Sequence, residues 1–368
     1  MMAGPPASVA RARLAVRAAL TERLTELADH TASLELSPRV LVGFSGGADS
    51  LALLTTTVWC AQRMGIDVDA AIIDHGLQPD SARVAERAAV TAERVGAAQI
   101  IQRRVEVAGT GGVEQAARAA RHAALEEIAD AQQSLAILLG HTLDDQAEQV
   151  LLGLARGAGA RSLAGIPRRR GRILRPFLGT GRDETTGLWR ADTQDICDRL
   201  DLDVWQDPMN DDADLLRIAV RTQALPALGE SLGEHVREAL VRTADLLRDD
   251  AEHLDAEARH VAEAVRVDAD RDGLLLALNA YQLAGQPRAI RTRVIKLASQ
   301  QATRDGGRPS GKTLLRRQIL QVDALLTAYH GQGPVPLPGK IEARRDEGAL
   351  LFTATHPQPL RGGPDDHF

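Results

Sequence analysis

The sequence predicts an α/β protein whose first half forms a parallel sheet, followed by a helical region and a short β-hairpin. Two observations lead to this prediction. Short apolar runs alternate with helical patterns in residues 40–155, and a long helical pattern covers residues 229–265. Strand–helix alternation is typical of a parallel sheet covered on both faces. Such sheets bind ligands at the carboxyl ends of their strands.

The expected strands are four apolar runs, and a helical pattern follows each of them. The runs are Val40–Phe44, Val68–Asp74, Gln99–Val105 and Leu135–Leu139, and the helical patterns begin at Ser50, Ser81, Val113 and Leu143. The Arg-rich start "ASVARARLAVRAALTERL" has apolar residues at helical spacing, with Glu22 and Glu26 close behind. We therefore expect a docking helix there rather than a transit peptide.

The remaining chain suggests further divisions. A first domain is expected over 1–228, because a long helical pattern begins after Pro226. A helical domain over 229–330 and a β-hairpin segment over 331–356, turning near Asp346-Glu347-Gly348, should follow. We expect a disordered tail over 357–368.

Composition limits the classes of function. The net charge of −6 argues against a protein that coats nucleic acid over its whole surface, but it permits a local basic patch. Cys60 and Cys197 are the only cysteines and form no CxxC pair, which fits a reducing cytoplasm. No apolar run approaches the roughly 18 residues needed to cross a bilayer, so we expect no membrane partner.

The segment "VLVGFSGGADSLALL" places a glycine-containing loop between the first strand and its helix. Gly46 and Gly47 let backbone N–H groups approach a ligand, and the helix N-terminus favours an anion. Ser45 and Ser50 add hydroxyl groups. Asp49 would repel phosphate unless it holds Mg²⁺, which can bridge to the phosphates. The alternative is a plain strand–helix turn with an acid in the first helical turn.

A second segment, "GGRPSGKT" at residues 306–313, matches the letters of a Walker A loop. A Walker loop requires a buried strand directly before it. The preceding "KLASQQATRD" is polar and helix-like. We therefore interpret this segment as a helix cap.

Acidic residues gather after the fourth expected strand. Asp144 and Glu148 share one face of a helix turn, with Asp145 beside them and His141 just before. Clustered acids at a strand edge repel one another unless a cation lies among them, and that cation can be Mg²⁺ or the ammonium group of an amino acid. His141 either polarises a phosphate or carbonyl group or caps the strand end.

Five segments together resemble the tRNA(Ile)-lysidine synthetase family of PP-loop ATP pyrophosphatases. They are "SGGADSLAL", "DHGLQPDSARVAERA", "VEQAARAARHAAL", "LGHTLDDQAEQVLLGLARGAGARSLAGI" and "LWRADTQDICDRLDLDVWQDPMNDDADLLRIAVRTQALPAL". They cover about residues 38–228. The resemblance implies a HUP-like, Rossmann-like catalytic domain, then a helical tRNA-binding domain.

The resemblance also implies a reaction. ATP would adenylate the wobble cytidine of an isoleucine tRNA with a CAU anticodon, and free lysine would then displace AMP. This is the chemistry of a C–N bond-forming ligase in the cytoplasm, and a homodimer is one expected state.

The implied site residues fall into five groups. The catalytic set is Asp49, Arg118, His141, Asp144, Asp145 and Glu148. The ATP-binding set is Ser45, Gly46, Gly47, Ala48, Asp49, Ser50 and His75. Lysine would be bound by Asp145 and Glu148, and Mg²⁺ by Asp49 and Asp144. The tRNA-binding set is Arg156, Arg161, Arg168, Arg169, Arg170, Arg217 and Arg221.

Three departures from the family pattern stand out. His122 replaces the usual tyrosine, and Ile218 replaces the Asn of the Arg-Asn-x-x-Arg motif. Residues 179–187 resemble an insertion. The alternative functions are a PP-loop tRNA 2-thiolation enzyme, which is expected to carry paired cysteines, and a small-molecule amidating ligase, which needs an ammonia source.

Overall fold

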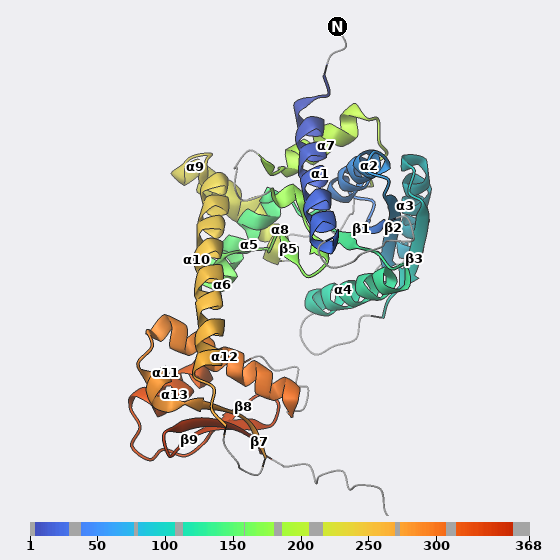
Figure 1. Ribbon diagram of the computed structural model, residues 1–368. Helices are drawn as coiled ribbons and strands as arrows, with labels where there is room; N and C mark the ends of the chain where they lie inside the picture. Colours follow the sequence, from blue (N-terminus) through green and yellow to red (C-terminus); the bar gives the residue numbers. More distant parts are fainter. Residues whose placement is uncertain are drawn as a thin grey trace, which may run out of the picture. The chain divides into compact units, whose positions relative to one another are not determined.

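The computed structural model describes residues 4–28, 38–76, 80–106, 113–157, 159–179, 186–205, 216–268, 273–306 and 314–355. The chain divides into two compact units, Met1–Arg248 and Asp249–Phe368. The division falls inside a long helix, α10 (Val236–Ala264) (Figure 1). The sequence suggested a division near residue 228, before the helical pattern that includes α10.

The first unit contains a six-stranded sheet with strand order β3-β2-β1-β4-β6-β5. All neighbouring strands are parallel except β5 and β6. The predicted parallel α/β fold is therefore confirmed. The strands are β1 (Arg39–Gly43), β2 (Asp67–Asp74), β3 (Gln99–Arg104), β4 (Ala136–Leu138), β5 (Arg169–Arg170) and β6 (Ile173–Leu174).

The helices of the sheet follow the strands closely, with starts that match the sequence pattern to within two residues. They are α2 (Ala48–Gln62), α3 (Ser81–Val95), α4 (Val113–Ala131) and α5 (Leu143–Ala155). The sequence missed β5 and β6, because strands of two residues carry no periodic signal.

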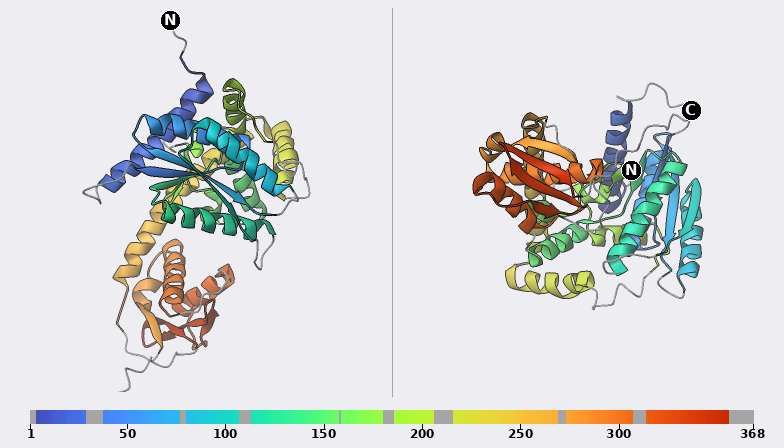
Figure 2. Two further views of the ribbon diagram at one scale, coloured as in Figure 1. Left: turned by 90° about the vertical axis from the view of Figure 1, so that its right-hand side faces the viewer. Right: turned by 90° about the horizontal axis from the view of Figure 1, so that it is seen from below.

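Helices cover both faces of this sheet (Figure 2). Successive strand side chains point to opposite faces. On β1, Val40 and Val42 join the core formed with the helices α1, α2 and α3, whereas Leu41 joins a second core with Leu125 and Ile128 of α4. Burial on both faces explains why these strands are continuous apolar runs.

The expected N-terminal docking helix is present as α1 (Ala7–Ala28). Its buried residues Val9, Ala12, Val16 and Leu20 belong to the same core as α2. Arg13 and Arg63 both lie over the ring of Trp59, each 3.7 Å from its centroid. The apolar spacing of α1 therefore serves packing against the α/β domain.

The first unit contains further short helical elements around β5 and β6. The helix α6 (Ala160–Leu163) precedes β5 in the chain. After β6 come η1 (Pro176–Leu178), α7 (Arg190–Arg199), α8 (Leu216–Ala219), the π-helical segment η4 (Val220–Ala224) and α9 (Leu225–Leu232). The predicted long helix is interrupted before α10 at Gly233, whose φ is 106°. Leu143, Ala147 and Val241 take part in a small core that joins α5 to α10.

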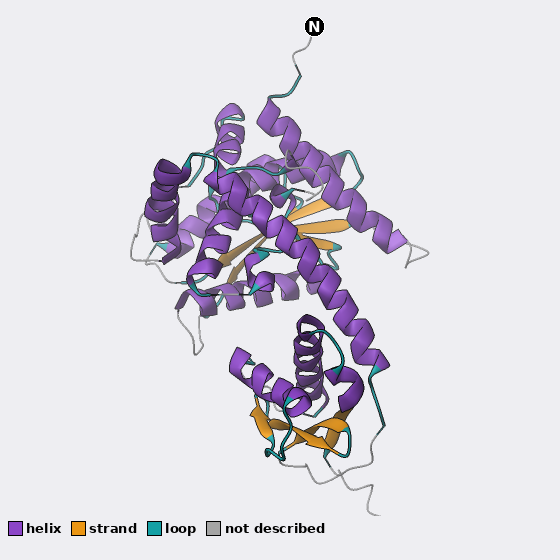
Figure 3. Ribbon diagram, turned by 90° about the vertical axis from the view of Figure 1, so that its left-hand side faces the viewer, coloured by secondary structure: helices purple, strands orange, loops and turns teal. Residues whose placement is uncertain are grey.

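The second unit is an antiparallel sheet, ordered β7-β10-β9-β8, with helices against one face (Figure 3). Its elements are β7 (Leu274–Asn279), α11 (Ala280–Ala284), α12 (Arg288–Asp305), α13 (Arg316–Thr327), β8 (Val335–Leu337), β9 (Ile341–Asp346) and β10 (Ala349–Ala354). The predicted hairpin turn at Glu347-Gly348 is confirmed. The sequence missed β7, the short apolar run "LLLALN", which lies in the region predicted as helical.

Several sequence features lie outside the described residues. They include the tail after residue 355, residues 180–185 of the insertion-like segment, and residues 307–313 of the Walker-like segment. Within the described residues, no helix is long and apolar enough to cross a membrane.

Candidate active site

The loop after β1 is held by its own serines. The backbone N–H of Ser45 donates to Ser50 Oγ at 3.2 Å, and the two Oγ atoms also lie 3.2 Å apart. Ser50 Oγ donates to the carbonyl of Gly47 at 2.9 Å. Gly46 has a φ of 88°, a conformation that favours glycine. The result is a tight turn before the N-terminus of α2, the local geometry that suits an anion.

The end of β4 contacts the backbone of this loop. A Cβ atom at Gly140 would lie 2.8 Å from the Asp49 carbonyl oxygen and 3.2 Å from the Ser50 Cα. Because backbone atoms cannot move aside as a flexible side chain can, only glycine fits here. Gly140 therefore lets the residues after β4 approach the loop after β1.

Asp49 lies at this contact and is partly buried. Its carboxylate accepts a hydrogen bond from Thr193 Oγ1 and lies 3.5 Å from Arg190 Nε. Burial raises the pKa of Asp49, and the charge of Asp145 adds to this, while Thr193 and Arg190 oppose it. Thr193 and Arg190 belong to α7, so this helix holds the acid of the loop.

Arg190 lies among the acidic side chains. Its guanidinium group is 3.3 Å from Asp145 Oδ1 and 3.4 Å from Glu148 Oε1, in addition to its contact with Asp49. Its backbone N–H donates to Asp144 Oδ2 at 2.7 Å. Burial lowers the pKa of Arg190, but the carboxylates more than offset this and the net shift is upward. The sequence analysis missed this residue.

Asp145 has two roles in this arrangement. Its Oδ2 accepts hydrogen bonds from the backbone N–H and the hydroxyl group of Thr142 at the start of α5. Its Oδ1 faces Arg190. Burial raises the pKa of Asp145, but the charge of Arg190 and the hydrogen bond from the Thr142 N–H contribute to a net downward shift. The carboxylate is therefore both a helix cap and a charged member of the cluster.

Glu148 is fully buried and lies among three arginines. Arg221 Nε donates to Oε1 at 2.8 Å, Arg217 Nε lies 3.4 Å from Oε2, and Arg190 completes the set. Arg221 comes from the π-helical segment, a feature frequent at functional sites. The tRNA-binding role predicted for Arg217 and Arg221 stays a prediction; both contact Glu148. Ile218, which replaces the family Asn, is buried.

A cavity of about 530 Å³ opens beside Asp144 and Glu148. Asp144 Oδ1 lies 3.4 Å from Arg237 Nη1, which reaches it from α10. The other lining residues include both signs of charge and an apolar wall, namely Trp189, Arg190, Ala191, Arg221, Leu225, Glu234 and Glu238. Paired charges beside an apolar wall suit an amino acid, whose two charged ends flank a carbon chain.

Positive charge gathers on the other side of His141. Burial lowers the pKa of His141 to about 3; Asp145 opposes this, while Arg175, Arg121 and Arg118 act in the same direction as burial. The imidazole is therefore neutral near pH 7. Burial also lowers the pKa of His75, which follows β2, and Arg121 adds to this. Within the described part of the chain, the Nδ1 atoms of His75 and His141 have no hydrogen-bond partner.

The arginines of the basic stretch after α5 differ in their exposure and in their ion pairs. Arg156, Arg161 and Arg170 are exposed. Arg168 pairs with Asp245 at 2.7 Å, and Arg169 pairs with Glu26. The role of these arginines in binding tRNA stays a prediction.

The donor set around the loop fits Mg²⁺ only in part. Among the described residues, no three His, Cys, Asp or Glu side chains gather so that they could hold a metal ion. Mg²⁺ beside nucleotides is usually held by one or two carboxylates, with phosphate oxygens and water completing the shell. Asp49 and Asp144 can supply such carboxylates, although the acid whose charge acts on Asp49 is Asp145.

Comparisons with known proteins identify the family of this chain. The sequence model of the PP-loop domain matches residues 17–228, which is more than half of the chain. A tRNA(Ile)-lysidine synthase from Leifsonia xyli subsp. xyli is 46% identical, over 85% of this chain and 89% of its own. One from Thermobifida fusca is 42% identical, over 96% and 100%.

Among solved structures, the U34-tRNA thiolase NcsA from Methanococcus maripaludis overlaps 63% of this chain and 80% of its own, with 17% identity and a TM-score of 0.46. The match to the PP-loop domain and the extent and identity of the two curated relatives define the family. This chain belongs to the tRNA(Ile)-lysidine synthase family and contains its PP-loop domain.

Proposed function

We propose that this protein ligates lysine to C2 of the wobble cytidine of an isoleucine tRNA, using ATP. The observation that carries the proposal is the direct contact between the loop of Ser45–Ser50 and the acidic cluster after β4, made through Asp49 and Arg190. A single site can then hold ATP and an amine together. Family membership, with relatives named tRNA(Ile)-lysidine synthase, supports this reaction.

In the first step, the ring carbonyl oxygen of the cytidine attacks the α-phosphate of ATP, and pyrophosphate leaves. The backbone amides of Gly46, Gly47 and Ala48 and the hydroxyl groups of Ser45 and Ser50 bind the leaving phosphates. Arg118 stabilises the charge on the α-phosphate, and neutral His141 supplies a hydrogen-bonding group. Fixed donors of this kind stabilise charge without rearranging. Asp49 and Asp144 would hold Mg²⁺, which neutralises phosphate charge when bound.

In the second step, the ε-amine of lysine attacks the adenylated carbon, and AMP leaves. Asp145 and Glu148 attract the ammonium group, and one of the two carboxylates accepts the proton that the amine must lose. Both acids contact Arg190, so the incoming ammonium group exchanges with an arginine that already occupies the cluster. The cavity beside Asp144 offers the remainder of lysine an apolar wall.

The tRNA partner carries the CAU anticodon in this proposal. Arg156, Arg161 and Arg170 contact its phosphates, and the region 229–330 binds the tRNA body. The reaction takes place in the cytoplasm, where tRNA and lysine are available, and a homodimer is one state in which the protein works.

The chemistry of the two cysteines argues against the thiolation alternative. Cys60 and Cys197 are both buried. Burial raises the pKa of Cys197 to about 12, and burial also raises the pKa of Cys60. Thiol nucleophiles act as thiolates. Neither residue is therefore suited to transfer sulfur.

The experiment is mass analysis of tRNA nucleosides. The protein is incubated with a CAU-anticodon isoleucine tRNA transcript, ATP, Mg²⁺ and lysine, and the tRNA is digested. We expect the wobble cytidine to be replaced by its lysine adduct, with one AMP and one pyrophosphate released per adduct. A transcript with uridine at the wobble position is the control and should stay unmodified.

Two results would overturn this proposal. A sulfur-containing nucleoside formed without any need for lysine would identify a thiolation enzyme. AMP release with ammonia and a small acid, independent of tRNA, would identify an amidating ligase.

A further inference from the structure

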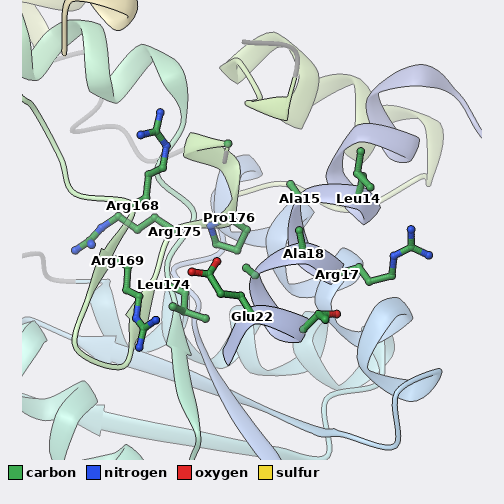
Figure 4. Close-up of a pocket in the computed structure, with 13 residues that line it drawn as sticks. Leu14, Ala15, Arg17, Ala18, Glu22, Arg168, Arg169, Leu174, Arg175 and Pro176 are labelled. Carbon is green, nitrogen blue, oxygen red and sulfur yellow. The ribbon is translucent and has the colours of Figure 1, made fainter. Parts of the chain in front are cut away.

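A separate cavity of about 740 Å³ lies between α1 and the chain around β5 and β6 (Figure 4). Its apolar lining residues include Ala18, Leu174 and Pro176. None of its lining residues belongs to the loop after β1 or to the acidic cluster after β4. A volume of this size is typical of sites for small ligands or for part of a larger one.

The charge of this cavity is strongly positive. Its lining contains the four arginines Arg17, Arg168, Arg169 and Arg175, against a single acid, Glu22. Arg169 also pairs with Glu26, but both side chains are more than one-third exposed. Exposed pairs contribute little to stability and exchange partners readily. Arg168 is held more firmly, by Asp245 and the carbonyl of Leu178.

Arg175 is the arginine of this cavity whose environment most favours an added anion. The residue is 4% exposed, and Nη1 donates to the carbonyl of Pro167 at 2.9 Å. Within the described residues, its Nε atom has no hydrogen-bond partner. Burial, together with the charges of Arg118 and Arg170, lowers the pKa of Arg175 to about 10. A buried guanidinium among other cations is costly unless an anion joins it.

The carboxylate of Glu22 supplies some negative charge near these arginines. Figure 4 shows its carboxylate directed toward the side of the cavity where Arg168, Arg169 and Arg175 lie. Its charge contributes to raising the pKa of Arg169, after the larger effect of Glu26. Glu22 itself is exposed, on the last turns of α1. A carboxylate in this position can be exchanged for a phosphate at little cost.

We propose that this cavity binds a phosphodiester group of the RNA substrate, and that the Glu22 carboxylate takes the place of the phosphate in the free protein. The proposal rests on the proposed function for the identity of the RNA. Arg175 links the cavity to the catalytic edge, since its charge also acts on His141. A strand whose target base enters the active site therefore passes a second anion site nearby. The proposed phosphate site for ATP is the separate loop Ser45–Ser50, and the apolar lining residues of the cavity suit a sugar or base.

The test compares tRNA affinity across matched variants, measured by direct binding at several salt concentrations. Glu22→Gln removes the competing carboxylate, and we expect tRNA affinity to rise roughly three- to tenfold. Arg169→Gln should lower tRNA affinity by a similar factor and reduce the slope of log affinity against log salt by about one. The KM values for ATP and lysine should stay unchanged in both variants.

Two exposed residues on α3 serve as controls. Glu93→Gln and Arg94→Gln make the same charge changes away from the cavity. If each control shifts tRNA affinity as much as its partner variant, general electrostatics explains the effect and the proposal is overturned. Unchanged affinity in both Glu22→Gln and Arg169→Gln overturns it as well.

Two further outcomes keep this test separate from that of the proposed function. A lower KM for ATP in Glu22→Gln, with tRNA affinity unchanged, would assign the anion to the nucleotide and reject the RNA site. If the protein forms no lysine adduct but the Glu22→Gln variant binds tRNA more tightly, the proposed function is rejected and the RNA site in the cavity is supported.

Discussion

The acidic cluster after β4 contains an arginine among its acids, and the basic cavity beside α1 contains an acid among its arginines. In the cluster, Arg190 contacts Asp49, Asp145 and Glu148 in a largely buried setting. In the cavity, exposed Glu22 faces arginines. Buried ion pairs are costly to break, whereas exposed pairs are worth about 0–1 kcal/mol. The cluster is therefore a preorganised site, and the cavity is a surface that exchanges partners.

The largest effect is expected at Asp49. Asp49→Asn removes the charge that faces Thr193 and Arg190, and we expect pyrophosphate release to fall by about 10²–10³-fold, as for other lost electrostatic groups. Asp67→Asn, which changes a surface ion pair with Arg39, is the control and should keep nearly full activity. Equal activity in Asp49→Asn and wild type would remove Asp49 from the mechanism.

Replacement of Arg190 tests the cluster as a unit. Arg190→Gln leaves three carboxylates close together with less positive charge, so the free energy of unfolding should fall by about 3 kcal/mol. Denaturant unfolding measures this change. Arg199→Gln, on the same helix but in an exposed pair with Asp195, should change stability by less than about 1 kcal/mol. Similar losses in the two variants would show that Arg190 is an ordinary surface arginine.

Replacement of Gly140 tests the backbone contact between the residues after β4 and the loop after β1. Gly140→Ala places a methyl group 2.8 Å from the Asp49 carbonyl oxygen, and we expect a loss of about 1–3 kcal/mol in stability together with reduced ATP binding. Gly333→Ala is the control, because no atom lies within 4 Å of its added Cβ. Wild-type ATP affinity in Gly140→Ala would mean that the loop does not depend on this contact.

The buried imidazole of His141 should make the stability of the protein depend on pH. The pKa of His141 is lowered to about 3 from its ordinary value near 6.5. The unfolded chain therefore binds a proton there that the folded chain excludes, so this residue reduces stability as pH falls below about 6.5. His141→Asn should make the loss of stability between pH 6.5 and 4 less steep, by up to about 1.4 kcal/mol per pH unit. Parallel pH profiles for variant and wild type would show that the pKa of His141 is the same in the folded and the unfolded protein.

The smallest effect is expected at the rim of the cavity. Glu26→Gln breaks the exposed pair with Arg169, and the free energy of unfolding should change by less than about 1 kcal/mol. Thermal unfolding measures this change. A loss close to that of Arg190→Gln would contradict the contrast between the two regions.

The sequence predicted the parts of the fold that have a period or a turn signal. The strands β1–β4, the helices that follow them and the hairpin turn at Glu347-Gly348 all carry such signals. The two-residue strands β5 and β6 do not, and β7 is a short apolar run that fits a strand or a buried helix equally well.

The residues of the site also divide into those that a local sequence motif predicts and those that only long-range packing brings together. Ser45, Gly46 and Ser50 form a local motif, and so do the acids of α5. Arg190, Thr193 and Gly140 reach the site only because α7 and β4 pack beside the loop. Nothing in "LWRADTQDIC" distinguishes Arg190 from an ordinary helix-start arginine, so long-range packing had to reveal it.

The central claim is that one site first activates the RNA with ATP and then admits the amine. Its most direct test is the burst of pyrophosphate in a rapid-quench experiment with tRNA and ATP, without lysine. We predict up to one pyrophosphate per active site with AMP retained on the RNA, and release of AMP when lysine is added. Continuous AMP release without tRNA, or pyrophosphate release only when lysine is present, would contradict this order.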